Sequence, residues 1–478
     1  MERKTSWLCE RFCLLCAAVF CGVISVQSIL AALGSHPLIS AAGGVCAAAV
    51  LVLAVRFWPM GDRNTCITLF LVRFGLAMAV ILLIGAQPVQ DFSTMYTAAQ
   101  DMARGGRDYL ENVYYYNWAY QTGFVFYESL LLRLFGPGQL SLQVMNAVWL
   151  GGTGVLVFRI ALRLLPRRAA LGASLLFALY PAPYFLAAVL TNQHIAAFFY
   201  YLAVWILLGR KELSLPRAAL AGGVIALGNV MRPIGIILVL AALCWAAVEQ
   251  LLTHRERWGR AAAKLAALAG TYFLVFSLCS QAIVWSGLNP QGLTNNQPMW
   301  KFVLGLNPDS SGGWNRTDYD SFLSLPAQEA DQAMRQAVRE RLGAGPAALA
   351  RLAVRKSAVM WGAEEYMFWG FGHLDGQRRF GPATVNQLVQ VLCSGDKGVY
   401  SAVFLLALAG AAALLRRGSG GQGALLPAFL LCGYYGVHLI VEVQSRYRYF
   451  LMPAVFLLAG FGLAALTERF YNLRKDDL

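Results

Sequence analysis

Charged residues are scarce in this chain. Only 13% of its 478 residues are Asp, Glu, Lys or Arg, whereas roughly a quarter of the residues of an ordinary soluble domain are charged. Hydrophobic residues make up 58%, a balance that excludes a water-soluble surface. A helix that crosses a hydrocarbon core about 30 Å thick needs about 20 apolar residues, and such runs recur along nearly the whole sequence. The composition therefore predicts an all-α polytopic membrane protein.

The apolar runs predict about 12 transmembrane helices. They lie at 12–33, 38–57, 66–86, 140–162, 169–189, 193–208, 217–230, 233–252, 264–286, 398–415, 424–443 and 449–466. The seventh run is short and meets the eighth at Met231-Arg232-Pro233, so whether both cross the membrane completely stays open. The first run has no A-x-A cleavage site and a second run follows at once, which predicts an uncleaved first helix rather than a signal peptide.

The formal net charge of +14 has a topological explanation. The basic residues form short clusters between apolar runs, and each cluster follows an even number of predicted spans, as the positive-inside rule requires of cytoplasmic loops. We therefore expect both termini in the cytoplasm and no nucleic-acid partner. The ten cysteines lie almost entirely in apolar runs and indicate no disulfide framework.

Two long segments, 87–139 and 287–397, interrupt the pattern of short loops and fall on the external side in this topology. The first segment predicts two amphipathic helices that lie in the membrane interface. The second predicts a small cap with a helical region at 326–356. The chain is thus divided into an N-terminal transmembrane module (1–286) that contains the loop 87–139, a large external loop (287–397) and C-terminal transmembrane helices (398–478). Function is expected in the two external segments.

The candidate chemistry begins with Asp91, just beyond the external end of the third predicted span. A carboxylate there can act as a general base toward an acceptor hydroxyl or amine, although an isolated Asp is more often a helix N-cap or a solvated loop residue. Arg232 and the pair Arg446 and Arg448 lie at membrane boundaries, where a guanidinium suits a phosphate. The alternative for each arginine is snorkelling toward lipid headgroups. Together, the three positions predict a phospholipid-like substrate.

In the order of these features the sequence resembles the GT-C class of membrane glycosyltransferases, of the family 39 type that includes protein mannosyltransferases and aminoarabinose transferases. The similarity covers most of the chain. It rests on Gln90-Asp91-Phe92, Tyr120-Gln121-Thr122-Gly123, Met231-Arg232-Pro233 and the run from Glu442 to Arg448. Each motif is weak alone, and the combination is moderately specific.

The resemblance implies an inverting transfer of a sugar from a polyprenyl-phosphate-linked donor, on the external face of the cytoplasmic membrane, to a lipid, glycan or protein acceptor. It implies that Asp91 is catalytic and that Arg232 and Arg446 bind the lipid phosphate. Further substrate contacts are expected from Arg448, Tyr120, Gln121 and His194. The chain departs from the family in two places: Trp118-Ala119-Tyr120 replaces a Tyr-Pro pair, and Asn192-Gln193-His194 stands where many relatives have an acidic residue.

No metal signature or other cofactor is evident. Asp309, Glu364 and Glu365 could hold a divalent cation together with Asp91, but their spacing matches no known motif and we expect no metal. Three tryptophans of the second segment are candidates for stacking on sugar rings or for anchoring in the interface: Trp314, Trp361 and Trp369.

Two other classes of membrane protein compete with a glycosyltransferase. A transporter or flippase of lipid-linked oligosaccharides would also have about 12 spans and arginines, but it often shows repeated halves and charges near the midplane. This chain shows neither. A membrane glycan polymerase is the third interpretation, and in such an enzyme Asp91 would be dispensable.

Overall fold

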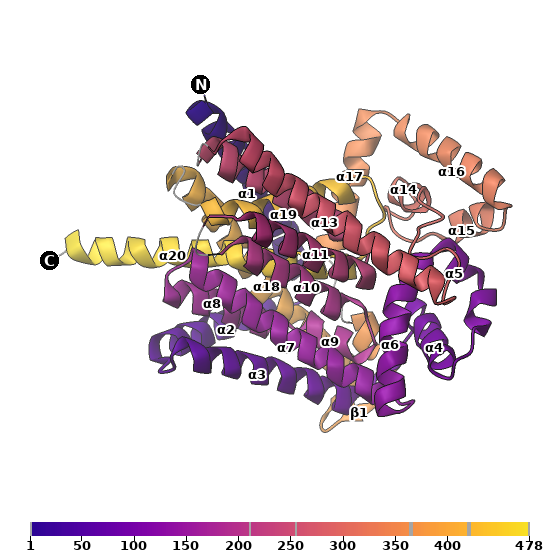
Figure 1. Cartoon of the computed structure of the whole chain (residues 1–478). Helices are drawn as coiled ribbons and strands as arrows, with labels where there is room; N and C mark the ends of the chain where they lie inside the picture. Colours follow the sequence, from indigo (N-terminus) through magenta and orange to yellow (C-terminus); the bar gives the residue numbers. More distant parts are fainter. Residues whose placement is uncertain (1, 210–211, 254–255, 363–366, 418–421, 477–478) are drawn as a thin grey trace.

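A computed structural model describes residues 2–209, 212–253, 256–362, 367–417 and 422–476, and it is almost entirely helical (Figure 1). Six of its helices are long and apolar enough to cross a membrane by length and composition. They are α1 (Glu2–Leu33), α2 (Pro37–Phe57), α3 (Asp62–Ile84), α7 (Gln139–Leu164), α13 (Trp258–Trp285) and α18 (Val385–Arg417). Much of α2 and α13 is exposed, as expected of helices that face lipid.

Shorter apolar helices complete the bundle. The helices α8 (Arg167–Leu179) and α9 (Ala182–Ala188) form one pair, bent by 48° at a break that contains Pro181, a residue without an N–H to continue the helix. The others are α10 (Gln193–Leu207), α11 (Leu215–Met231), α12 (Gly235–Ala247) with the π-turn η3 (Val248–Thr253), α19 (Leu425–His438) and α20 (Met452–Asp476). Every predicted span therefore falls on a helix, which confirms the all-α membrane fold, while the number of complete crossings stays a prediction.

The helix boundaries differ from the predicted spans in two places that matter for the site. The helix α18 begins at Val385, inside the segment predicted as loop. The helix α19 ends at His438, and the chain then runs without α-helix through Glu442 to η6 (Ser445–Phe450). Hydropathy alone does not locate these ends, because polar residues tolerated at a helix end look the same in sequence as loop residues.

The two long segments gather at one end of the bundle, opposite the first turn of α1 and the last turns of α20 (Figure 1). We call it the loop end. The first segment contains α4 (Asp91–Ala103), η1 (Asp108–Glu111), α5 (Val113–Asn117), η2 (Ala119–Gln121) and α6 (Thr122–Phe135). The second contains α14 (Trp300–Gly305), α15 (Arg316–Phe322), α16 (Ala327–Leu342), α17 (Pro346–Gly362), the π-turn η4 (Met367–Phe371) and a hairpin of β1 (Arg379–Phe380) and β2 (Ala383–Thr384). The hairpin pairs Arg379 with Thr384 and Phe380 with Ala383, and η5 (Gln422–Ala424) precedes α19.

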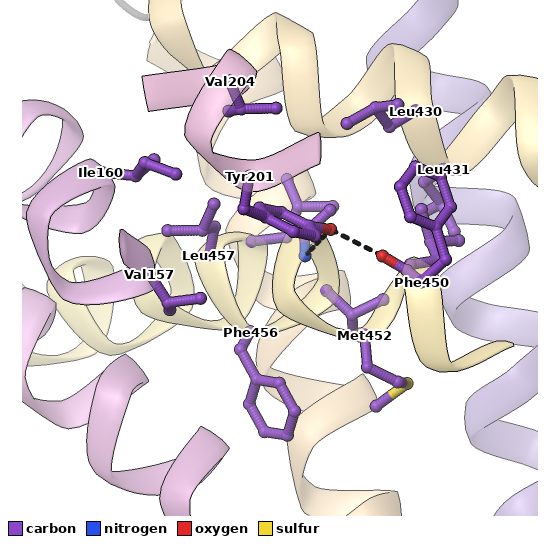
Figure 2. Close-up of a cluster of buried hydrophobic side chains, with 14 of the residues drawn as sticks. Val157, Ile160, Tyr201, Val204, Leu430, Leu431, Phe450, Met452, Phe456 and Leu457 are labelled. Atoms are coloured by element: carbon purple, nitrogen blue, oxygen red, sulfur yellow. Dashed lines mark hydrogen bonds between the residues drawn. The ribbon is translucent and has the colours of Figure 1, made fainter. Parts of the chain in front are cut away.

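A buried apolar cluster at the centre of the bundle holds η6 in place. Figure 2 shows side chains of α7, α10, α19 and α20 around Tyr201. The Tyr201 hydroxyl donates to the carbonyl of Phe450 (2.9 Å) and accepts from the N–H of Ala454 (3.1 Å). Because Phe450 is the last residue of η6, this contact ties η6 to the membrane bundle.

Close helix packing in the bundle depends on glycine. A Cβ on Gly410 of α18 would collide with the carbonyl oxygen of Leu458 in α20, and a Cβ on Gly462 would collide with that of Leu406. Small residues at such crossings let two helix backbones approach closely, and in lipid this packing replaces the hydrophobic effect as the source of association.

Gly410→Leu is therefore expected to destabilise the protein by about 3 kcal/mol, the upper range for overpacking, because backbone rather than a flexible side chain must move. Gly75→Leu on α3 is the matched control, since a Cβ there would have open space around it, with no atom within 4 Å outside its own helix backbone and chain neighbours. The midpoint of thermal unfolding in detergent should fall for the first variant and stay unchanged for the second. Equal midpoints would contradict the packing account.

Candidate active site

Asp91 is the first residue of α4, at the loop end of the bundle. The preceding residue, Gln90, has a φ of 51° and a ψ of −129°, a conformation that strongly favours glycine and costs a non-glycine residue about 1–3 kcal/mol. The carboxylate lies in the first turn of the helix, where the helix dipole stabilises negative charge. Its side chain is half-exposed (48%), so it remains accessible to a second reactant.

Arg446 of η6 faces this carboxylate. Its Nη2 lies 3.6 Å from Oδ2 of Asp91, and its Nε donates to Oε1 of Gln444 at 2.7 Å. The arginine side chain is only 7% exposed. Three aromatic rings lie within cation–π distance of its Cζ, namely Trp369 (4.8 Å), Phe92 (4.9 Å) and Tyr447 (5.7 Å). The guanidinium is thus fixed on several sides and oriented toward Asp91.

A second ion pair adjoins the first. Glu442 is buried and pairs with Lys301 of α14. The same carboxylate accepts from Tyr447 Oη (3.0 Å) and from Nε2 of Gln444 (2.7 Å). Burial would lower the pKa of Lys301, but the Glu442 carboxylate raises it above its usual range. Because Gln444 contacts both Glu442 and Arg446, the two ion pairs form one continuous network.

Arg232 follows the last residue of α11 and has a different environment. Its Nη1 donates to Oδ1 of Asn192 at 2.8 Å, and its Cζ lies 5.5 Å from the ring centroid of Tyr447. Asn192 in turn contacts Oε1 of Gln121 (3.4 Å), whose Nε2 reaches the hydroxyl of Tyr114 (3.2 Å). Among the described residues, no carboxylate lies within 4 Å of Arg232.

Tyr120 belongs to the same cluster. The charges of Lys301, Arg232 and Asp91 all act on its phenol, and burial raises the pKa of Tyr120 to about 12. The hydroxyl is therefore neutral at physiological pH and able to donate a hydrogen bond. The cluster as a whole contains three cations, Arg232, Lys301 and Arg446, against the two carboxylates Asp91 and Glu442, which leaves one uncompensated positive charge.

Two predicted substrate contacts lie elsewhere. His194 is fully buried and its Nδ1 lies 2.7 Å from the hydroxyl of Tyr449, a contact that links α10 to η6. Arg448 is also buried; its Nη1 donates to the carbonyl of Met360 (3.1 Å) and its Cζ stacks 4.8 Å from the ring of Tyr400. The structure brings together Asp91, Arg232, Arg446, Tyr120 and Gln121, but it does not bring these two residues into the cluster.

The three tryptophan candidates have different environments. Trp369 stacks on Arg446 at the site, Trp361 is buried against Phe404 and Tyr435, and Trp314 is 53% exposed. Glu364 and Glu365 lie outside the described residues. Within the described part of the chain, no group of three or more His, Cys, Asp or Glu side chains is arranged to hold a metal ion.

Several residues of the cluster had no predicted role. Lys301, Glu442, Gln444, Tyr447 and Asn192 form it together with the predicted residues. One sequence signal could have revealed this part of the cluster: Glu442 is an acidic residue at the end of the apolar run 424–443. A charge at that position needs a partner.

Comparison with known proteins gives structural neighbours only. No protein-family model matches the sequence and no curated protein matches it. The apo oligosaccharyltransferase of Archaeoglobus fulgidus aligns with a TM-score of 0.50 and 14% identity over 88% of this chain and 52% of its own. The oligosaccharyltransferase AglB of the same organism, in complex with an inhibitory peptide and a dolichol-phosphate, aligns with a TM-score of 0.43 and 13% identity over 89% of this chain and 52% of its own. ArnT from Cupriavidus metallidurans bound to undecaprenyl phosphate aligns with a TM-score of 0.33 and 14% identity over 84% of this chain and 78% of its own.

The alignment with the apo oligosaccharyltransferase establishes a shared fold, and that fold is the GT-C fold of membrane glycosyltransferases. The chain is a multi-pass membrane protein of this fold. It spans about half the length of the oligosaccharyltransferase.

Gln90→Gly is expected to stabilise the protein by about 1 kcal/mol, because glycine removes the cost of the positive φ and only part of that gain is lost to the greater freedom of the unfolded chain. Gln87→Gly is the control, since Gln87 has no positive φ and the substitution there should destabilise slightly. Thermal unfolding of both variants measures the difference. A loss of stability in Gln90→Gly would show that the conformation carries no strain.

Proposed function

We propose that the protein is a glycosyltransferase that moves a sugar from a polyprenyl-phosphate donor to an acceptor at the loop end of the bundle. The observation that carries the proposal is the uncompensated charge of Arg232, in the same cluster as the accessible carboxylate of Asp91, which is held by Arg446. A guanidinium at a membrane boundary that is bound only to a neutral group is suited to binding a phosphate. The phosphate oxygens can accept two parallel hydrogen bonds from its N–H groups. The fold shared with an oligosaccharyltransferase supports this assignment.

The roles of the two arginines differ in this proposal. Arg446 is already paired with Asp91 and enclosed by aromatic rings, so its main effect is to orient the carboxylate. Arg232 is the principal ligand of the donor phosphate. Tyr120 and Gln121 of η2 are neutral polar residues of the same cluster, and we assign them contacts with the sugar of the donor.

The transfer is a displacement at the anomeric carbon. The oxygen or nitrogen of the acceptor forms a bond to that carbon while the bond from the carbon to the phosphate oxygen breaks. Asp91 accepts the proton of the acceptor, and the polyprenyl phosphate leaves with its developing negative charge stabilised by Arg232. Attack opposite the leaving group inverts the anomeric configuration, and no covalent intermediate with the protein is required.

We place the loop end on the external face of the cytoplasmic membrane. The basic clusters support this orientation, because Arg56, Arg163, Arg167 and Arg416 lie at the helix ends remote from α4. Cationic loops are retained in the cytoplasm. An external site fits an acceptor of the cell envelope.

Arg232→Met should weaken the binding of undecaprenyl phosphate, used as a probe, by about tenfold or more, since a hydrogen bond to a charged group contributes about 1.5–3 kcal/mol. Arg316→Met, which removes an exposed arginine of α15 paired with Asp320, is the control and should leave the affinity unchanged. Native mass spectrometry or fluorescence titration in detergent measures both. An equal affinity in wild type and Arg232→Met would exclude Arg232 as the phosphate ligand.

Asp91→Asn should reduce turnover by about 10²- to 10⁴-fold, the range for a positioned general base, while undecaprenyl phosphate still binds. The assay incubates the protein with polyprenyl-phosphate sugars and envelope acceptors extracted from bacterial membranes and quantifies the polyprenyl phosphate released. Asp320→Asn on the exposed face of α15 is the matched control. Full turnover in Asp91→Asn would rule out the catalytic role and favour a polymerase.

A further inference from the structure

Lys356 is a buried lysine outside the cluster described above. It lies in α17, is 1% exposed, and its Nζ donates to three backbone carbonyls: Gly305 at 2.6 Å, Val441 at 2.8 Å and Leu439 at 3.0 Å. Three acceptors require all three hydrogens of the ammonium group, whereas a neutral amine offers two. The contacts therefore define a charged clamp on three carbonyls from two separate segments.

The clamped carbonyls flank the second ion pair of the site. Gly305 is the last residue of α14, the helix that carries Lys301. Leu439 and Val441 belong to the stretch between α19 and Glu442. The backbone N–H of Glu442 donates to the carbonyl of Lys301 at 2.8 Å. Lys356 thus joins the chain segment of Glu442 to the helix of Lys301 through backbone carbonyls, independently of their ion pair.

The stem of Lys356 is also tightly enclosed. A Cβ on Gly312, a residue with a φ of +78°, would lie 2.7 Å from Cγ of the lysine. The carbonyl of Gly312 accepts from the N–H of Val443 at 2.9 Å, so the same turn of the second segment covers the lysine and pairs with the clamped stretch. Only glycine fits this position.

Retaining a charge here has a cost. Burial lowers the pKa of Lys356 to about 7, and the Glu442 carboxylate only partly opposes this effect. A buried ammonium is stable only when it is fully hydrogen-bonded, because its removal from water is unfavourable. An apolar residue of similar length would fill the same space without this desolvation cost. We therefore attribute the role of Lys356 to the three hydrogen bonds that its ammonium group donates.

We propose that Lys356 is a positioning residue that fixes Glu442 against Lys301 and thereby holds the network from Glu442 through Gln444 to Arg446 in register with Asp91. The clamp itself follows from the contacts alone. Its effect on phosphate binding rests on the proposed function. The residue acts through the backbone and contacts no reacting atom.

Hydrogen exchange tests the clamp without a ligand. Lys356→Met removes all three donors at nearly constant volume, and backbone exchange of peptides covering 439–445 should rise by about tenfold, the equivalent of about 1.4 kcal/mol. Lys356→Gln, which keeps two N–H donors, should give an intermediate rise, and it provides the readout if the methionine variant fails to fold. Unchanged exchange in the folded variants would overturn the clamp.

Lys264→Met is the matched control. Lys264 is a partly buried lysine bound to Gln250 (2.8 Å) and Glu256 (2.7 Å). It lies near the start of α13, about 30 Å along the helix from Trp285 at the rise of an α-helix. Its loss should leave exchange at 439–445 unchanged. A rise of the same size there would show a global loss of stability rather than a local clamp.

Titration with undecaprenyl phosphate then tests the positioning role. The affinity of Lys356→Met should fall by about tenfold, and that of Lys264→Met should not change. A faster exchange at 439–445 with unaltered affinity would overturn the positioning role while the clamp stands. If the wild-type protein does not bind the probe, the proposed function fails, and the exchange experiment still decides the clamp.

Discussion

The guanidinium of Arg446 is almost completely withdrawn from water, and it can remain charged there only because partners surround it. Asp91 neutralises it, Gln444 accepts from its Nε, and aromatic rings cover its faces. An isolated buried charge would be strongly destabilising, and removing one partner of a buried pair leaves that cost in place. The position of α4 relative to η6 therefore depends on this pair, and so does the orientation of the proposed catalytic carboxylate.

The same electrostatic constraint organises the rest of the loop end. Glu442 neutralises Lys301, and Lys356 binds three carbonyls beside them. Within the described part of the chain, the guanidinium of Arg232 has the neutral side chain of Asn192 as its hydrogen-bond partner. Of the three cations of the cluster, Arg232 is the one with no carboxylate within 4 Å in the described part of the chain. In a membrane-boundary site of low polarity, the remaining positive charge is the strongest attraction for an anion. This asymmetry is the basis of the proposal that the substrate bears a phosphate.

The sequence allowed the prediction of the apolar helices and of the position of Asp91 just beyond the third of them, because hydropathy and position relative to a span are local properties; its catalytic role stays a prediction. It did not reveal the pair of Lys301 and Glu442, whose members are separated by 141 residues, since a lone sequence carries no record of such contacts. Arg446 and Arg448 looked equivalent in sequence. They belong to the 3₁₀ segment η6, in which the side chains of residues two apart point in directions about 120° apart, and Arg446 is the one that faces Asp91.

The most direct test of the central claim is mass spectrometry of the lipids that co-purify with the wild-type protein and with Asp91→Asn. A glycosyltransferase that binds its donor through Arg232 and needs Asp91 for transfer should accumulate a polyprenyl-phosphate sugar on the variant, above the level on the wild type. The mass of that lipid would also identify the sugar. Only bulk phospholipid on both proteins, or the same lipid-linked oligosaccharide on both, would contradict the account.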